Sequence, residues 1–348
     1  MAKILYAVAK EGMGHAIRSK TIIEELLKKH KIKIVSSGRP FHYLRRYFRD
    51  THKISDFDLV YTNNSVNYLL TFLSNLIRLP FMLIYNLKLV MLVSNFKPDI
   101  IITDFEPFSN YIAYLFRIPL ISIDNQHIIT KCKIDVPKKF MKDYLISYFI
   151  VNLIVNNAKK YFITSFFFPG VKEKNVSLFP PVIGRSILKA KPRKGEHVLV
   201  YQTSKSYKRL FKVLKKVNGK FIIYGFDKES VDKNLVFRKF NNGLFYKDLA
   251  ESKAVIANCG FTLISEAIYL KKPILSIPIR HQFEQIFNAI YLGKLGYGEF
   301  HEFLTEDNLK TFLSNLKTYE NNLKKFKKYD NSEIFKRIEE SVDIKGGN

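Results

Sequence analysis

Length, composition and charge limit the classes to which this chain can belong. Its 348 residues are enough for two domains that each bury a core, and 47% hydrophobic residues with 15 Gly and 12 Pro are typical of a globular α/β protein rather than a disordered one. The two cysteines, Cys132 and Cys259, are far apart, so neither a disulfide framework nor a zinc site is indicated, and a reduced cytoplasm is expected. The formal charge of +26 leaves nucleic acid and an anionic membrane surface open as partners.

The N-terminal segment predicts a strand, a glycine loop and a helix. Residues 3–9 form a short apolar run, Gly12 and Gly14 follow, and residues 16–29 have apolar side chains at helical spacing. The loop lacks the full G-x-G-x-x-G pattern, and no acidic residue closes the next predicted strand. A nicotinamide dinucleotide is therefore disfavoured.

Residues 68–96 are strongly apolar. Arg78, Pro80 and Lys88 interrupt them, which argues against a membrane-spanning helix and predicts two amphipathic helices hinged near Pro80. Together with the lysine-rich residues 131–142, this stretch fits two alternatives. The helices either cover the sheet or lie in a bilayer interface.

Two further apolar strands are predicted to end in polar loops, one at Asp104 and one at Asn125 and His127. Because the carboxyl ends of parallel strands open at one edge of a sheet, we expect both loops beside His15. A carboxylate next to a histidine raises its basicity and fixes its tautomer. Asp104 is therefore predicted to orient His15 or to act as a base itself, with loop hydrogen bonding as the simpler alternative.

The Pro180-Pro181 pair predicts an extended crossing between two domains, with the boundary near residue 184. A new strand over residues 197–201 leads into a polar loop that contains Thr203 and Ser204. Their hydroxyl groups, with nearby backbone amides, fit a phosphate site or a helix N-cap.

Residues 254–288 carry the most informative pattern of the chain. A strand meets Cys259-Gly260, a helical segment carries Thr262 and Glu266, and a second apolar strand leads into a polar cluster. A glycine at a strand-to-helix junction lets a ligand approach the backbone, where the helix amides and dipole favour a phosphate. The Glu266 carboxylate, within the first two turns, can accept two hydrogen bonds from a ribose diol. The pattern predicts a nucleotide held at both ends.

This pattern resembles the donor-binding motif of two-domain glycosyltransferases of the GT-B class, particularly the MurG-like and UDP-glycosyltransferase-like branch. The resemblance is carried by residues 259–267, Pro273, Pro278, Gln282, Gln285 and Asn288-Ala289. It implies two Rossmann-like α/β domains with doubly wound parallel sheets that face a cleft. Residues 1–183 would bind the acceptor and residues 184–325 the nucleotide sugar, while residues 326–348 would form a helix that crosses back toward the first domain and a tail.

The resemblance also implies roles for individual residues. Gly12-Met13-Gly14-His15 is similar to the family's first glycine-rich loop, which makes His15 the candidate base, paired with Asp104. The family usually has a glycine-rich phosphate loop where this chain has Thr203 and Ser204, and the missing glycine weakens that subsite. The diphosphate is expected to contact Cys259, Gly260, Phe261 and Thr262, and the ribose is expected to contact Glu266. The sugar is expected to contact Gln282, Glu284 and Gln285. The acceptor is expected near Gly12, Gly14, Asn125 and His127.

The resulting hypothesis is an inverting, metal-independent transfer of a sugar from a UDP-sugar co-substrate to a hydroxyl acceptor, without a cofactor. Asp56-Phe57-Asp58 is interpreted as a solvated loop rather than a metal site. An apolar and basic patch that MurG-like relatives use for lipid-linked acceptors implies a cytoplasmic enzyme that is peripheral on the inner face of the cell membrane. The alternatives are a nucleotide-sugar epimerase or hydrolase of the same fold, and a non-enzymatic basic protein that binds nucleic acid or membrane. No nucleic-acid-binding motif is present, so a specific nucleic-acid partner is not expected.

Overall fold

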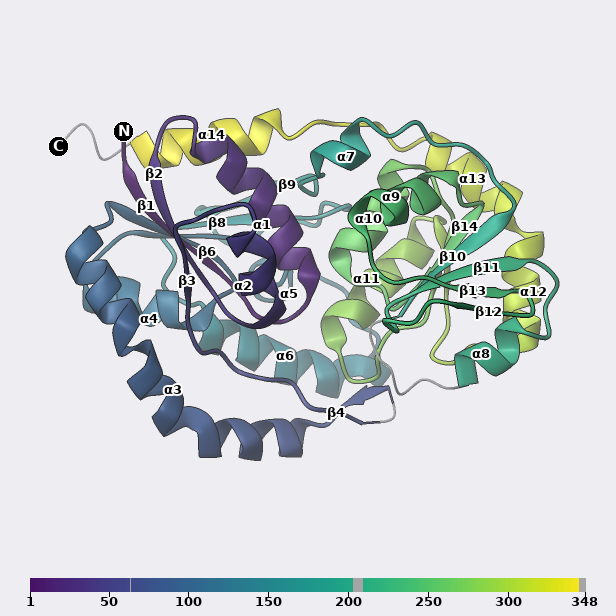
Figure 1. The fold of residues 1–348 in the computed structure, drawn as a ribbon, viewed down its shortest axis with the longest axis horizontal. Coiled ribbons are helices and arrows are strands. Elements are labelled where there is room, and N and C mark those ends of the chain that lie inside the picture. Colours follow the sequence, from purple (N-terminus) through teal and green to yellow (C-terminus); the bar gives the residue numbers. More distant parts are fainter. Residues whose placement is uncertain (63, 203–208, 344–348) are drawn as a thin grey trace. The chain divides into compact units, whose positions relative to one another are not determined.

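The computed structural model describes residues 1–62, 64–202 and 209–343, and the chain divides into two compact units (Figure 1). Unit 1 contains Met1–Val60, Tyr68–Gly184 and the chain from Asp330 onward, and unit 2 contains Tyr61–Asn67 and Arg185–Tyr329. The sequence prediction placed residues 61–67 in the first domain. They belong to unit 2 instead because their backbone pairs with Arg280, which accepts from Val66 N (3.0 Å) and donates to Asn64 O (3.0 Å).

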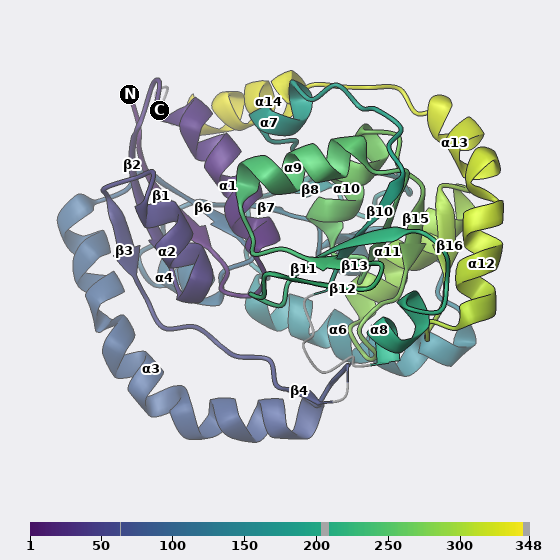
Figure 2. The ribbon, with the colours of Figure 1, turned by 45° about the vertical axis from the view of Figure 1, so that its right-hand side comes forward.

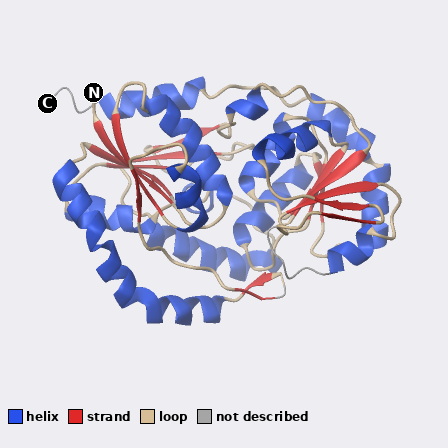
Figure 3. Ribbon diagram, in the orientation of Figure 1, coloured by secondary structure: helices blue, strands red, loops and turns tan. Residues whose placement is uncertain are grey.

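Unit 1 is built on a seven-stranded sheet in the order β3-β2-β1-β6-β7-β8-β9, with every pair of neighbours parallel. Figure 3 shows its strands in red, with helices in blue around them. The order reverses direction between β1 and β6, which is the switch point where doubly wound sheets bind ligands at the carboxyl ends of their strands. The strands are β1 (Lys3–Val8), β2 (Lys31–Ser36), β3 (Thr51–Lys53), β6 (Ile100–Asp104), β7 (Leu120–Asp124), β8 (Lys160–Thr164) and β9 (Val176–Phe179).

Helices from both ends of the chain bury this sheet. Ile22 and Ile23 of one helix and Ile334 and Ile338 of the last helix share a core cluster with the strand residues. At the junction before the last helix, buried Asn331 accepts from Ile183 N (3.0 Å) and donates to Ile183 O (2.8 Å). The helices are α1 (Met13–Leu26), α2 (Gly38–Arg45), α3 (Tyr68–Phe96), α4 (Pro107–Leu115), α5 (Ile128–Lys131), α6 (Met141–Ile154) and α14 (Ser332–Asp343), with a 3-10 turn, η1 (Lys138–Phe140).

The apolar stretch forms the single helix α3, so the prediction of two helices hinged near Pro80 was wrong. Pro80 removes one backbone donor, but the helix continues through it. Figure 1 and Figure 2 show that α3 is bent along its length. Side-chain bonds hold α3 to the preceding loop on both sides of Pro80, where Asn75 bonds Asp58 N and O (2.9 and 2.7 Å) and Asn86 bonds Ser55 N and O (2.8 and 2.9 Å).

Among the described residues, α3 alone is long and apolar enough to cross a membrane, judged by length and composition only, with a mean hydropathy of 1.8. Its 29 residues correspond to about 43 Å of helix, against a hydrocarbon core of about 30 Å. Arg78, Pro80 and Lys88 were expected from the sequence to leave no stretch of this length and apolarity, and that expectation was wrong.

Unit 2 contains a second seven-stranded sheet, in the order β12-β13-β11-β10-β14-β15-β16, which is parallel except for the antiparallel β12-β13 pair. The prediction of two doubly wound α/β sheets is confirmed. Its strands are β10 (His197–Tyr201), β11 (Lys220–Tyr224), β12 (Ser230–Asp232), β13 (Leu235–Phe237), β14 (Ala254–Ala257), β15 (Ile274–Ser276) and β16 (Gly298–Phe300), with the separate pair β4 (Tyr61–Thr62) and β5 (Ser65–Val66).

The switch point of this second sheet lies between β10 and β14, which are neighbours. The helix that follows β14 begins at this point, and apolar residues of α8 and α12 share the core with the strands. The helices are α7 (Arg185–Leu188), α8 (Arg209–Leu214), α9 (Asn242–Glu251), α10 (Phe261–Tyr269), α11 (Phe283–Lys294), α12 (Glu306–Ser314) and α13 (Leu316–Lys324).

Candidate active site

His15 and Asp104 meet at the switch point of unit 1. Asp104 is the last residue of β6, and His15 lies in the first turn of α1, directly after β1. Gly12 precedes the helix at φ 80°, a backbone conformation that side-chain-bearing residues rarely adopt, so a glycine suits this turn. His15 Nδ1 lies 2.6 Å from Asp104 Oδ1.

Two further residues of α1 surround the same carboxylate. Arg18 donates from Nε to Asp104 Oδ2 (3.0 Å) and from its second amino group to Oδ1, and Ser19 Oγ donates to Oδ2 (2.8 Å). Burial alone would raise the pKa of the Asp104 carboxyl, but the charge of Arg18 and the hydrogen bonds from His15 and Arg18 lower it to about 2. Asp104 is therefore ionised and is a weak base.

This ionised carboxylate fixes the proton on the imidazole ring. Because Asp104 Oδ1 can only accept, His15 Nδ1 donates to it, and the lone pair of the neutral ring lies on Nε2. Gln126 Nε2 lies 3.3 Å from that second nitrogen. The arrangement is a histidine oriented by a carboxylate, with the basic nitrogen on the other side of the ring.

The residues predicted on the acceptor side have different surroundings. Arg18 donates to Asn125 Oδ1 (3.1 Å), so Asn125 takes part in the polar cluster. His127 is fully buried, with Nδ1 2.6 Å from Asp124 Oδ2 and Nε2 2.9 Å from Val155 O. Both of its ring nitrogens are engaged inside unit 1, which leaves the predicted contact between His127 and an acceptor without a geometric basis. Gly14 lies within the first turn of α1.

In unit 2, the strand-to-helix junction has the predicted form. Cys259 adopts φ 65°, and Gly260 is the N-cap of α10 with no side-chain cap. A Cβ added at Gly260 would have no atom within 4 Å, so there is room at the helix N-terminus, where amides and dipole favour an anion. Phe261 is buried and Thr262 half-buried at this terminus. Cys259 is buried, and burial raises the pKa of its thiol to about 12.

Glu266 is an anomalous carboxyl group on the same helix. It is 3% exposed, burial raises its pKa to about 8, and its Oε1 atom has no hydrogen-bond partner among the described residues. A buried polar atom that makes no bond is costly, and such atoms often mark functional positions. A ribose diol would satisfy this carboxylate.

The polar loop after β15 contributes a second group of this kind. Gln282 is the N-cap residue of α11, and its buried Oε1 has no partner among the described residues. Glu284 lies near enough to Cys259 for its charge to act on the thiol. Gln285 differs because its Oε1 accepts from Ile279 N (2.9 Å), which gives it a role in holding the loop. Thr203 and Ser204 lie outside the described residues.

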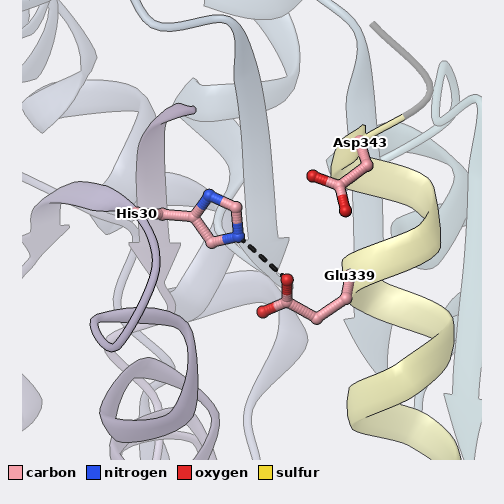
Figure 4. A group of neighbouring side chains, drawn as sticks. All are labelled: His30, Glu339 and Asp343. Atoms are coloured by element: carbon pink, nitrogen blue, oxygen red, sulfur yellow. Dashed lines mark hydrogen bonds and ion pairs between the residues drawn. The ribbon is translucent and has the colours of Figure 1, made fainter. Parts of the chain in front are cut away.

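Two clusters of acidic residues bear on metal binding in unit 1. His30, Glu339 and Asp343 lie within reach of one ion in unit 1 (Figure 4). However, His30 Nδ1 accepts from Ala2 N (3.1 Å), so Nε2 carries the proton and donates to Glu339 Oε2 (3.1 Å) instead of offering a lone pair. These residues therefore fit a structural contact between α14 and the rest of unit 1 better than a metal site.

The Asp56-Phe57-Asp58 segment is not the solvated loop that was predicted. Asp56 is buried and accepts from Lys10 N (3.1 Å) and Phe57 N (2.7 Å). Asp58 forms ion pairs with Lys10 and Arg78. The two carboxylates are thus occupied within unit 1.

Sequence reasoning missed Arg18, Ser19 and Gln126. Arg18 and Ser19 follow His15 by three and four residues, the spacing that places side chains on one face of a helix. That spacing was the available signal, although in a chain with 57 basic residues an arginine in a helix is usually on the surface.

A pair of Rossmann-like sheets, a histidine–carboxylate pair at one switch point and an anion-favouring helix terminus at the other together define a GT-B type glycosyltransferase. A family model described as Glycosyl transferase family 1 matches residues 2–317. The chain belongs to that family and is a glycosyltransferase. No curated protein sequence matches it significantly.

Solved structures share the fold at low sequence identity. CalG4, the calicheamicin glycosyltransferase, superposes with a TM-score of 0.68 at 12% identity, covering 100% of both chains. The glycotransferase of kitacinnamycin has a TM-score of 0.67 at 15% identity, covering 93% of each chain. Phytolacca americana UGT2, solved with UDP-2fluoro-glucose and pterostilbene, has a TM-score of 0.66 at 13% identity, covering 98% of this chain and 99% of that one. The predicted GT-B resemblance is confirmed.

Proposed function

We propose that this glycosyltransferase moves a sugar from a UDP-linked donor to a hydroxyl acceptor with inversion at the anomeric carbon. The observation that carries the proposal is the His15–Asp104 pair, in which Nδ1 is held by an ionised carboxylate and Nε2 is basic. Asp104, whose pKa is about 2, is too weak a base to compete with the imidazole. Of the two bases that the sequence left open, His15 and Asp104, the low pKa of Asp104 therefore supports His15.

In the proposed reaction, His15 Nε2 takes the proton of the acceptor hydroxyl while the oxygen attacks the anomeric carbon. The bond from that carbon to the diphosphate oxygen breaks, and its electron pair leaves with UDP. The N-terminus of α10 at Gly260 would stabilise the developing diphosphate charge, a role that preorganised backbone amides perform well. These amides provide the electrostatic stabilisation that a divalent cation supplies in other enzymes, so the proposal includes no metal.

The donor assignment is supported by Glu266 and Gln282, whose buried oxygen atoms have no partners among the described residues. Glu266 would accept from the ribose diol, and Gln282 and Glu284 would contact the sugar. A uridine nucleotide is favoured because the Phytolacca americana enzyme was solved with a UDP-sugar analogue.

Isothermal titration of UDP, GDP and TDP tests the donor site. We expect UDP to bind best and Glu266→Ala to weaken it about tenfold, the size of one good hydrogen-bonding contact. Glu333→Ala, on the exposed face of α14, is the matched control and should leave the affinity unchanged. Equal affinity in the Glu266→Ala and native proteins would remove this residue from the donor site.

Turnover tests the base. His15→Ala and Asp104→Asn should each lower kcat by at least about 100-fold with little change in UDP affinity, whereas His42→Ala, an exposed histidine of α2, should leave kcat unchanged. The anomeric configuration of the product, read by NMR, should be opposite to that of the donor. Conversion of a UDP-sugar without any acceptor would instead support a hydrolase or epimerase.

We further propose that the enzyme is cytoplasmic and peripheral on the membrane, with a lipid-linked acceptor. None of the described residues in the first half of α3 is buried, and Leu69, Phe72, Ile77 and Phe81 are each more than 60% exposed. Because side-chain bonds tie α3 to unit 1 along its length, we infer that it lies in the interface rather than crossing it. Phe72→Ser/Ile77→Ser should abolish sedimentation with lipid vesicles while leaving UDP affinity intact, and undiminished sedimentation would contradict the placement.

A further inference from the structure

Unit 1 contains a cavity of about 680 Å³ that is separate from the candidate active site. It lies between the edge strand β3, the end of α2 and the second half of α3. None of its lining residues belongs to the His15–Asp104 cluster. Its volume lies in the range typical of small-molecule sites.

The lining of the cavity has a strong excess of positive charge. Arg45, Arg49, Lys53 and Lys88 contribute four cations, against the single carboxylate of Asp50. The ion pairs found among the described residues include none of these five side chains. All five side chains are exposed, so solvent screens the repulsion among the four cations, and a bound anion would relieve what remains of it.

Two of the cations are already held in place, which lowers the entropy cost of binding an anion. Arg45 donates from Nη1 to the carbonyl oxygens of Arg49 and Thr51 (3.1 Å to Thr51), and its other guanidinium N–H groups remain for a ligand. Lys88 Nζ lies over the Tyr85 ring, 4.6 Å from its centroid.

His52 adds a neutral polar group to the lining. Its Nε2 atom is buried and has no hydrogen-bond partner within the part of the chain that the structure describes. Burial first, and then the charge of Lys33, lower the pKa of this ring, which favours its uncharged form. In its uncharged form the ring adds nothing to the charge repulsion in the lining.

The position of the cavity on α3 indicates where its ligand comes from. Met82, Asn86, Leu89 and Val93 form the buried stripe of α3, at spacings of four, three and four residues. Leu89 and Lys88 line the cavity, and the exposed apolar side chains Ile84, Leu87 and Met91 lie on the same turns. When apolar side chains of this kind enter a bilayer interface, cations beside them come level with the lipid phosphates.

We propose that this cavity binds the phosphate group of a membrane lipid. Arg49, Lys53 and Lys88 contact the phosphate, Arg45 presents its remaining N–H groups to it, and the apolar side chains of α3 contact the adjoining acyl chains. The proposal rests on the interfacial placement of α3 proposed above, and it adds a headgroup site that takes no part in sugar transfer.

Sedimentation with vesicles tests this site, using phosphatidylcholine vesicles with and without 30 mol% phosphatidylglycerol as the probe. Arg49→Gln/Lys53→Gln should weaken binding to the anionic vesicles by about 30-fold, the effect of removing two cations at a lipid surface. Lys327→Gln/Lys336→Gln removes the same charge from exposed positions outside the cavity and α3, and should change binding less than about twofold. Turnover of a water-soluble acceptor should be unchanged in both variants.

Three results would overturn the proposal. Equal losses in the cavity variant and the control variant would show that only net charge matters. Undiminished binding by the cavity variant would remove the site, even if Phe72→Ser/Ile77→Ser still abolishes sedimentation and so preserves the interfacial placement. The third result concerns inorganic phosphate and glycerol 3-phosphate. If either binds the native protein but not the cavity variant, and the cavity variant still binds vesicles like the native protein, the site would be assigned to a soluble phosphate.

Discussion

Glu266→Gln separates the charge of the buried carboxyl from its shape. In the native protein, burial raises the pKa of Glu266 from 4.5 to about 8, and no cation among the described residues offsets it. Below pH 4.5 the carboxyl is protonated in both the folded and the unfolded chain, so it has no pH-dependent effect. As the pH rises from 4.5 to 8, the unfolded chain releases the proton while the folded chain retains it, and the folded state loses stability throughout that window.

The size of this loss follows from the two pKa values. Each unit of pKa difference corresponds to about 1.4 kcal/mol, so the cost approaches about 3 kcal/mol at pH 7 and about 5 kcal/mol above pH 8. Glutamine has nearly the same shape and does not ionise. We therefore expect Glu266→Gln to match the native protein near pH 4.5 and to be progressively more stable than it between pH 5 and pH 8.

Urea denaturation of both proteins from pH 5 to pH 8.5 measures the difference directly. If the difference between the native and variant free energies of unfolding does not change with pH, Glu266 titrates alike in the folded and the unfolded chain. That result would refute a raised pKa for Glu266. A second measurement uses UDP. If the ribose diol bonds the ionised carboxylate, UDP binding at pH 7 should release close to one proton in the native protein and none in Glu266→Gln, measured by calorimetry in buffers of different ionisation enthalpy.

Two further predictions concern structural bonds of unit 1. Arg18→Met should destabilise the protein by about 3–5 kcal/mol at pH 8, because it leaves the buried Asp104 carboxylate without its guanidinium partner. The pKa of Asp104 should then rise, so the loss should shrink at pH 5, whereas an equal loss at both pH values would show that the ion pair is not its cause. Asn331→Ala should cost about 1–3 kcal/mol by removing both bonds to Ile183, measured by urea denaturation. Glu333→Ala, in the first turn of α14, is the control, and a loss in it as large as that of Asn331→Ala would contradict a specific role for the bonds between Asn331 and Ile183.

The sequence was sufficient to predict which loops meet in unit 1. His15 and Asp104 each follow an apolar strand, and in a doubly wound sheet the loops at the switch point face the same edge. The strand-to-helix junction at Gly260 was predictable because a short apolar strand is followed there by helical spacing of apolar residues. Local pattern and sheet topology agree at these positions.

Other features depend on contacts between distant residues, which local patterns do not encode. Pro80 does not end α3 because Asn75 and Asn86 bind the preceding loop on either side of it, and tertiary bonds outweigh the lost backbone donor. Asp56 is buried because the amide of Lys10, 46 residues away, donates to it. His127 resembled a substrate contact in sequence, and only its full burial against Val155 O shows otherwise.

The return of the chain to unit 1 at its end has a consequence for synthesis. Ile334, Ile338 and Val342 of α14 belong to the core of the sheet that β1 begins. A ribosome therefore delivers every segment of unit 2 before it delivers the last helix of unit 1. The unit that emerges first therefore completes its core last, and until then the apolar residues that pack against α14 are exposed, which favours aggregation.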